Sequence, residues 1–144
     1  MSGRLNKLFP DLKIIETNYF EVHQDWEVPI PGFFILAPKR KIRSIDEFVY
    51  EELVDYINLI HKVRKAMRVE LNIDTVFFFQ NEDTKHNYHL WIFPRYEWMK
   101  AFGGGINSVK PIMNYAIENM IDKSNIDDVH TCAAKLKKYI SDKF

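Results

Sequence analysis

The eleven residues from Lys85 to Arg95 constrain the fold more than any other stretch of this chain. They are rich in aromatic and β-branched side chains and end at a proline, which predicts a strand buried on at least one face. Successive side chains of a strand point to opposite faces, so the stretch divides into two rows. The first row is Asn87, His89, Trp91 and Phe93, and the second is His86, Tyr88, Leu90 and Ile92. One face therefore presents an imidazole between a carboxamide and an indole, and we expect the chemistry there.

Length and charge limit the classes of protein that this chain can belong to. Its 144 residues suit one domain, 1–144, with one core. The formal net charge of zero argues against a general electrostatic grip on nucleic acid or an anionic membrane. No apolar run is long enough to span a bilayer, and the N-terminus has no signal-peptide core, so we expect a cytoplasmic protein.

A metal or disulfide framework is not expected. The single cysteine, Cys132, excludes an internal disulfide and a cysteine-based zinc site. His86 and His89 should point to opposite faces of their strand, and no third ligand accompanies them, so we expect no metal there. We also expect no cofactor.

The first 80 residues predict strands on either side of a long helix. After an arm at 1–13, strands are expected at 17–23 and 33–37, the second bracketed by Pro31-Gly32 and Pro38. Ser44 and Glu47 have the spacing of a capping box and predict a helix from there to about residue 70. Its predicted buried stripe is Val49, Leu53, Ile57, Ile60, Val63, Met67 and Leu71.

The second half predicts a hairpin and two helices. A strand at 75–79 and a tight polar turn at 80–84 lead antiparallel into the His89 strand. One helix should follow Asn107 or Ser108, and its predicted apolar face is Met113, Ile117, Met120 and Ile121. A last helix should begin near Ser124 or Asn125, and its predicted stripe runs through Val129, Cys132 or Ala133, and Leu136. The fold class is therefore α+β: an antiparallel sheet of about five strands, one long helix packed on it, and two C-terminal helices.

The motif His89-x-Trp91-x-x-Pro94-Arg95 resembles the histidine triad (HIT) family. Aligned on Pro94-Arg95, the family's middle, nucleophilic histidine is His89, and the first and third positions are Asn87 and Trp91. Asp25 followed by residues 31–39 resembles the family's earlier segment, in which an aspartate holds a ribose and a strand ends in Pro-Lys. The resemblance covers about residues 17–95 and leaves a C-terminal extension at about 107–142 outside it.

The chain departs from the family pattern at several positions. Two of the three triad positions are not histidine, so the motif is an N-x-H-x-W-x-x-P-R version, similar to a divergent bacterial branch. Phe33 and Lys41 stand where many members have further histidines. His86 looks like a displaced first histidine, but strand alternation places it opposite His89 unless the chain bulges.

The resemblance implies an activity on the α-phosphate of a nucleotide derivative. In the family, the middle imidazole attacks phosphorus and forms a nucleotidyl-histidine, which is hydrolysed or passed to an acceptor. The substrates implied are dinucleoside polyphosphates, such as diadenosine tetraphosphate, or nucleoside phosphoramidates. A neutral imidazole, with an ordinary pKa near 6.5, is a competent nucleophile at neutral pH. Its second nitrogen should donate to a carbonyl that fixes the tautomer.

The resemblance and the residue types together give a predicted site. His89 is the catalytic residue, and phosphate should be bound by Asn87, Trp91, Thr84 and Asn81. The nucleotide should contact Asp25 through the ribose and Phe20, Trp26 and Tyr19 through the base. Two alternatives stay open: a HIT-like nucleotide-binding protein with little or no turnover, and an interaction protein that uses its aromatic surface to pair. The family also implies a homodimer.

Overall fold

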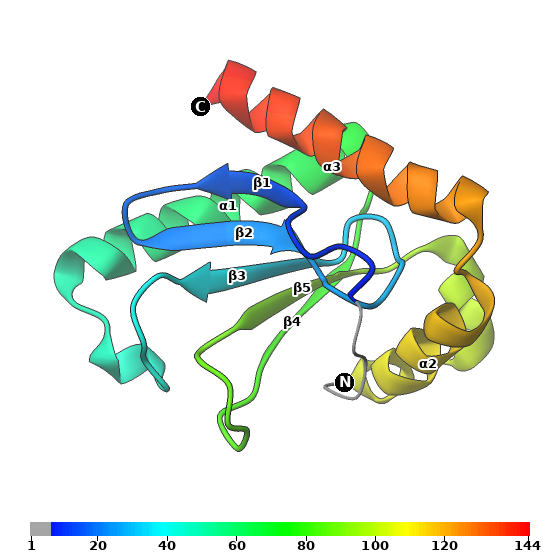
Figure 1. Ribbon diagram of the computed structural model, residues 1–144, viewed down its shortest axis with the longest axis horizontal. Coiled ribbons are helices and arrows are strands. Elements are labelled where there is room, and N and C mark those ends of the chain that lie inside the picture. Colours follow the sequence, from blue (N-terminus) through cyan, green and yellow to red (C-terminus); the bar gives the residue numbers. More distant parts are fainter. Residues whose placement is uncertain (1–6) are drawn as a thin grey trace.

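The computed structural model describes residues 7–144 and has a five-stranded antiparallel sheet in the order β1-β2-β3-β5-β4 (Figure 1). The strands are β1 Lys13–Glu16, β2 Phe20–Gln24, β3 Phe34–Pro38, β4 Val76–Gln80 and β5 Leu90–Pro94. The α-helices are α1 Tyr50–Leu71, α2 Val109–Asn119 and α3 Lys123–Lys143, with 3-10 turns at Ile45–Glu47, Glu97–Phe102 and Ile106–Ser108. The predicted α+β class is confirmed.

The face of the sheet that carries α1 and α3 holds the larger core. Alternate residues of the three central strands point into it, namely Phe20, Val22, Phe34, Leu36, Leu90 and Ile92. α1 runs behind the sheet in Figure 1, and α3 lies across α1 and β1. Cys132 is buried here between α3 and the sheet, as packing predicts.

The opposite face is only partly covered. Phe93 of β5 and Phe33, the residue before β3, pack in a second core cluster with α2 and with Met99 of the 3-10 turn Glu97–Phe102. α2 lies at one end of the sheet (Figure 1), and a cavity opens beside it. That cavity is where the candidate site lies.

Strand boundaries differ from the prediction in two places. β1 occupies Lys13–Glu16, between the expected arm at 1–13 and the expected strand at 17–23, and it pairs with β2. The hairpin of β4 and β5 forms as predicted, with Phe79 opposite Trp91, but its connection is nine residues, 81–89, and not a tight turn. β5 therefore begins at Leu90, after His89.

The long helix begins five residues later than the capping box suggested. The Glu47 carboxylate accepts the N–H of Ser44 at 2.9 Å, but it closes only a 3-10 turn over Ile45–Glu47. A second acid then starts α1, because Glu52 accepts the N–H of Val49 at 2.9 Å. Glu52 also binds the guanidinium of Arg40 at 2.7 and 2.8 Å, which ties the basic segment after β3 to the helix.

The predicted stripe of α1 was wrong in its first half. Val49, Leu53 and Ile57 are exposed. The buried residues of α1 are Glu52, Tyr56, Leu59, Val63, Ala66 and Met67, a line displaced around the helix. Tyr56 and Leu59 lie on the buried face of α1. The predicted apolar stripe missed this face because it includes a tyrosine, an aromatic residue with a polar end.

The two C-terminal helices form close to their predicted positions. Pro111 lies in the first turn of α2, and α3 begins after Asp122, whose carboxylate accepts the N–H of Asn125 at 2.9 Å. The stripe of α3 is buried as expected, whereas Ile121, assigned to the apolar face of the preceding helix, is exposed. Among residues 7–144, no helix combines the length and the apolar character needed to cross a membrane.

Candidate active site

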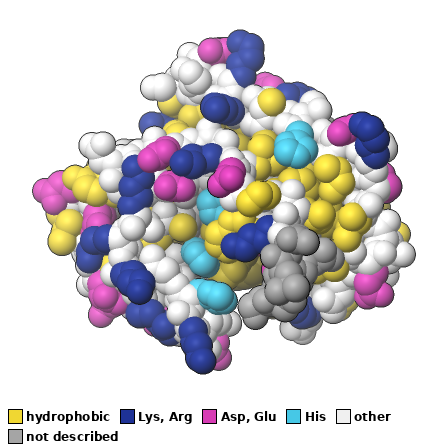
Figure 2. Space-filling view, in the orientation of Figure 1, with side chains coloured by type: hydrophobic (Ala, Val, Ile, Leu, Met, Phe, Trp, Pro, Cys, Tyr) yellow, Lys and Arg dark blue, Asp and Glu magenta, His cyan; other side chains and the backbone are white. Residues whose placement is uncertain are grey.

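A cavity of about 760 Å³ opens on the partly covered face of the sheet. Figure 2 shows histidine side chains gathered along one side of a patch of hydrophobic side chains on this part of the surface. Six of the nine predicted site residues line the cavity: Asp25, Trp26, Asn81, Thr84, His89 and Trp91. Tyr19 is exposed and does not line it. The structure brings these residues together, and their chemical roles stay predictions.

His89 lies at the end of the 81–89 connection, one residue before β5. Its half-buried ring meets the rings of Trp26 and Trp91 edge to face, with centroids 5.5 Å away in each case. Burial, and secondarily the positive charges that His23, His86 and Lys7 can carry, lowers the pKa of His89 to about 4. The imidazole is therefore neutral at pH 7, which is the form that can attack phosphorus.

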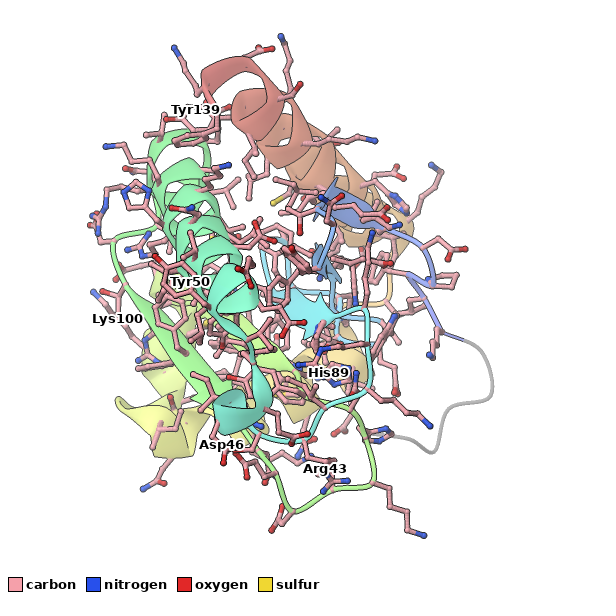
Figure 3. The ribbon with its side chains drawn as sticks, turned by 90° about the vertical axis from the view of Figure 1, so that its left-hand side faces the viewer. Arg43, Asp46, Tyr50, His89, Lys100 and Tyr139 are labelled. Carbon is pink, nitrogen blue, oxygen red and sulfur yellow. The ribbon has the colours of Figure 1, made fainter. Side chains whose placement is uncertain are left out.

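The His89 ring is positioned by aromatic contacts rather than by a carbonyl. Within residues 7–144, no hydrogen bond to either of its nitrogens is formed, so the expected carbonyl partner is not found. Figure 3 shows His89 inside the molecule, at the same end as Arg43. The two indole rings stand at 71° and 84° to the imidazole.

His86 lies in the same cavity as His89, so the expectation that it points to the opposite face was wrong. The two imidazole centroids are 6.4 Å apart, with 29° between their planes. Strand alternation does not apply, because residues 81–89 have no strand conformation and pairing begins only at Leu90. The N–H of His86 donates to the Thr84 hydroxyl at 3.2 Å, a local bond that replaces strand pairing.

Asp25 is a buried carboxylate at the end of β2. Its Oδ1 accepts the N–H groups of Glu27 and Val28 at 3.0 and 2.9 Å, and its Oδ2 accepts Nε1–H of Trp91 at 3.4 Å. Burial raises the pKa of Asp25, and these donors oppose that shift. Trp91, stacked on Phe79 at 5.6 Å and 12°, thus directs its one donor at Asp25 rather than into open space.

Trp26 forms a wall of the cavity and is held from two sides. The His23 ring lies 4.8 Å from it, and Nζ of Lys7 lies 4.3 Å from its ring centre. His23 is buried, its Nδ1 donates to the carbonyl of Gln24 at 2.9 Å, and burial lowers its pKa. No sequence pattern marked His23 as a site residue, because it was predicted only as the last residue of a strand.

Two further predicted site residues lie elsewhere, and these assignments were wrong. Asn87 accepts the N–H of Ile42 at 2.6 Å and donates to the carbonyl of Arg40 at 3.1 Å, so its amide fastens two connections together. Phe20 is fully buried on the other face of the sheet, with ring contacts to Phe48 and Tyr56. His23, which contacts Trp26 of the cavity, is three positions after Phe20 in β2. Because alternate residues of a strand share a face, Phe20 points to the opposite face.

The C-terminal extension contributes residues that the sequence did not assign to the site. Val109, Lys110 and Met113 of α2 line the cavity together with Ile106 of the turn before it. Periodicity along α2 marks which residues are apolar, but it cannot show that one end of the helix borders the His89 cavity. Among residues 7–144, no cluster of three or more histidine, cysteine, aspartate or glutamate side chains could hold a metal ion.

Comparison with known proteins finds similarity in structure rather than in sequence. No protein-family model and no curated protein matches the chain. A zinc-bound histidine triad family protein from Mycobacterium smegmatis matches with a TM-score of 0.62 and 17% identity, over 93% of this chain and 89% of that one.

Two further solved structures agree. A diadenosine triphosphate hydrolase from Plasmodium falciparum matches with a TM-score of 0.60 and 20% identity, over 92% of this chain and 78% of that one. A member of the HIT family from Bacillus subtilis matches with a TM-score of 0.56 and 20% identity, over 79% and 91%. The chain that carries the His89 motif therefore has the histidine triad fold.

Proposed function

We propose that this chain is a histidine triad family member that hydrolyses or transfers the nucleotidyl group of a nucleotide derivative through His89. The observation that carries the proposal is an imidazole at the wall of a cavity of about 760 Å³, with neither nitrogen hydrogen-bonded within residues 7–144. Burial lowers its pKa to about 4, so the ring is neutral at pH 7. A ring nitrogen attacks the α-phosphorus, and the bond to the leaving group breaks with its electron pair. Water or another acceptor then attacks phosphorus, and the P–N electron pair returns to His89.

The nucleoside would occupy the side of the cavity formed by Asp25 and Trp26. The Trp26 indole lines this side, and a base that stacks on it would take the place of Nζ of Lys7, which lies 4.3 Å from the ring centre. Oδ2 of Asp25 receives one long hydrogen bond, of 3.4 Å from Trp91, and a carboxylate oxygen can accept a second from a ribose hydroxyl. This arrangement supports a nucleoside ligand without Phe20.

Phosphate oxygens would meet donors from the 81–89 connection and from two lysines. The Thr84 hydroxyl and the Asn81 amide line the cavity. Lys7 and Lys110 line it as well, from the N-terminal segment and from α2. Positive charge on two sides favours substrates with several phosphates, such as dinucleoside polyphosphates. The Plasmodium falciparum diadenosine triphosphate hydrolase of the same fold supports this choice.

The test is AMP release by the purified full chain from diadenosine tetraphosphate and from an AMP phosphoramidate. We expect release by the wild type and a loss of about 100-fold or more in His89→Ala. His130→Ala is the matched control, because this exposed histidine of α3 lies outside the cavity. Equal activity in wild type and His89→Ala would overturn the proposal.

A nucleotide-binding protein with little turnover is the second candidate. It is favoured by the third motif position, because Trp91 directs its donor at Asp25 and an indole cannot act as an acid at neutral pH. For this candidate, AMP raises the melting temperature of the wild type while no AMP is released from either substrate. A shift without turnover would select it, and turnover would reject it.

We also propose that two copies pair through α1 and β4. β4 is an edge strand whose outer backbone groups have no strand beside them in residues 7–144. A shallow groove of about 390 Å³ next to it is lined by Ile57 of α1 and Phe78 of β4, which are 62% and 44% exposed. Tyr50 projects from the outward side of α1 in Figure 3. A second copy offers the same strand edge and the same apolar side chains, which a twofold interface requires.

A further inference from the structure

We propose that His86 is the acid–base residue of the site and protonates the leaving atom when His89 attacks. This inference rests on the proposed function and names a further catalytic residue for it. The structural basis is that His86 leaves the strand pattern and places a second imidazole in the cavity, 6.4 Å from the first. The position that strand alternation gives to a partner of His89 is occupied instead by Asn87, whose amide is bound to the backbone of Arg40 and Ile42.

The reaction needs a proton donor that the rest of the cavity does not supply. His89 cannot be the donor, because its nitrogen becomes bonded to phosphorus. Trp91 carries one N–H, which is not acidic at neutral pH and is directed at Asp25. His23 is buried and uses Nδ1–H for the carbonyl of Gln24.

Asp25 is also a poor donor. It already accepts three N–H groups, so its charged form is the one that its neighbours bind. Nζ of Lys7 lies over the Trp26 ring, 4.3 Å from its centre. Imidazole is the side chain that both gives and takes protons between about pH 5 and 8. His86 is exposed, so water reaches its ring.

The two rings border the same cavity. Their centroids are 6.4 Å apart, and no hydrogen bond joins them. A phosphoryl group bound in the cavity can therefore lie near both imidazoles. The Thr84 hydroxyl, which accepts the N–H of His86 at 3.2 Å, holds this part of the connection against the cavity.

His86 gives one proton in the first half-reaction and regains one in the second. A His89 nitrogen bonds to phosphorus, the bond to the leaving atom breaks, and that atom takes a proton from the His86 imidazolium. Neutral His86 then takes a proton from the water that attacks phosphorus. The P–N bond breaks, its electron pair returns to His89, and His86 is again protonated. The net change is the addition of one water, without any other co-reactant.

The test uses two AMP derivatives that differ only in the leaving group. A primary alkylamine phosphoramidate needs a proton on its leaving nitrogen, whereas a p-nitrophenyl ester leaves as a stable phenolate without one. We expect His86→Ala to lower kcat on the phosphoramidate by about 100-fold and to change kcat on the ester by less than about threefold. Free imidazole should restore part of the phosphoramidate activity.

The ester activity also reports that His86→Ala is folded. Equal losses on both substrates, or wild-type cleavage of the ester but not of the phosphoramidate, would overturn the role of His86 while the proposed function stands. Cleavage of neither substrate by the wild type would instead remove the proposed function. The two failures are therefore distinguishable in one experiment.

Discussion

Burial keeps the His89 imidazole neutral at pH 7, and the same burial makes the free energy of unfolding depend on pH. Burial beside two indoles disfavours the charged imidazolium, which lowers the pKa of His89 from 6.5 to about 4. Between these two pH values the unfolded chain binds a proton at this position that the folded chain does not. Stability must therefore fall as the pH drops through 6.5 toward 4, and this contribution is constant above 6.5. His23, whose pKa is also lowered by burial, acts in the same direction.

Replacing the imidazole should flatten the acid side of the stability profile. In His89→Gln, we expect the free energy of unfolding to fall less between about pH 7.5 and pH 5 than in the wild type, because one of the two protonation events is removed. Urea denaturation at both pH values measures this difference. His130→Gln is the control and should keep the wild-type slope. A slope in His89→Gln as steep as in the wild type would contradict a lowered pKa for His89.

Among the structural elements, those defined by local signals were predictable. Pro31-Gly32 and Pro38 bracket β3, and its apolar run forms the centre of the sheet as expected. The 81–89 connection was not predictable from its own residues. It leaves strand pairing where Asn87 binds the backbone of Arg40 and Ile42, which lie 47 and 45 residues away. The same departure turns His86 into the cavity, so the position of His86 was mispredicted where a distant contact overrides alternation.

The turn before β3 is a second place where the backbone fixes the site. Gly32 has φ +83°, and a Cβ there would lie 2.9 Å from Cδ1 of Leu71. We expect Gly32→Ala to lower the free energy of unfolding by about 1–3 kcal/mol, because both the left-handed backbone and the close contact oppose a side chain. Urea denaturation measures the change. Gly104→Ala is the control, since nothing lies within 4 Å of its added Cβ, and it should stay within about 0.5 kcal/mol. Equal effects at the two positions would contradict the strain argument.

At the scale of the whole molecule, the two faces of the sheet are covered differently. One face is closed by α1 and α3, and the other leaves the His89 cavity beside α2. The exposed half of α1 was predicted to be buried, and the prediction failed because the chain provides more apolar residues on this helix than its own sheet covers. Apolar side chains gathered beside an unpaired strand edge are the mark of a surface that pairs with another chain.

Breaking that surface should separate the two copies without touching the site. We expect the wild type to be a dimer in light scattering coupled to size exclusion and Phe78→Glu to be a monomer, because a carboxylate placed on β4 meets its own copy across a twofold axis. Ile121→Glu is matched in exposure, at 44% for both residues, and lies after α2, away from β4, so it should remain a dimer. A monomeric wild type, or a dimer that survives Phe78→Glu, would remove this interface. Unchanged AMP binding by the monomer would in turn show that the cavity is complete within one chain, as its lining from residues 7–113 indicates.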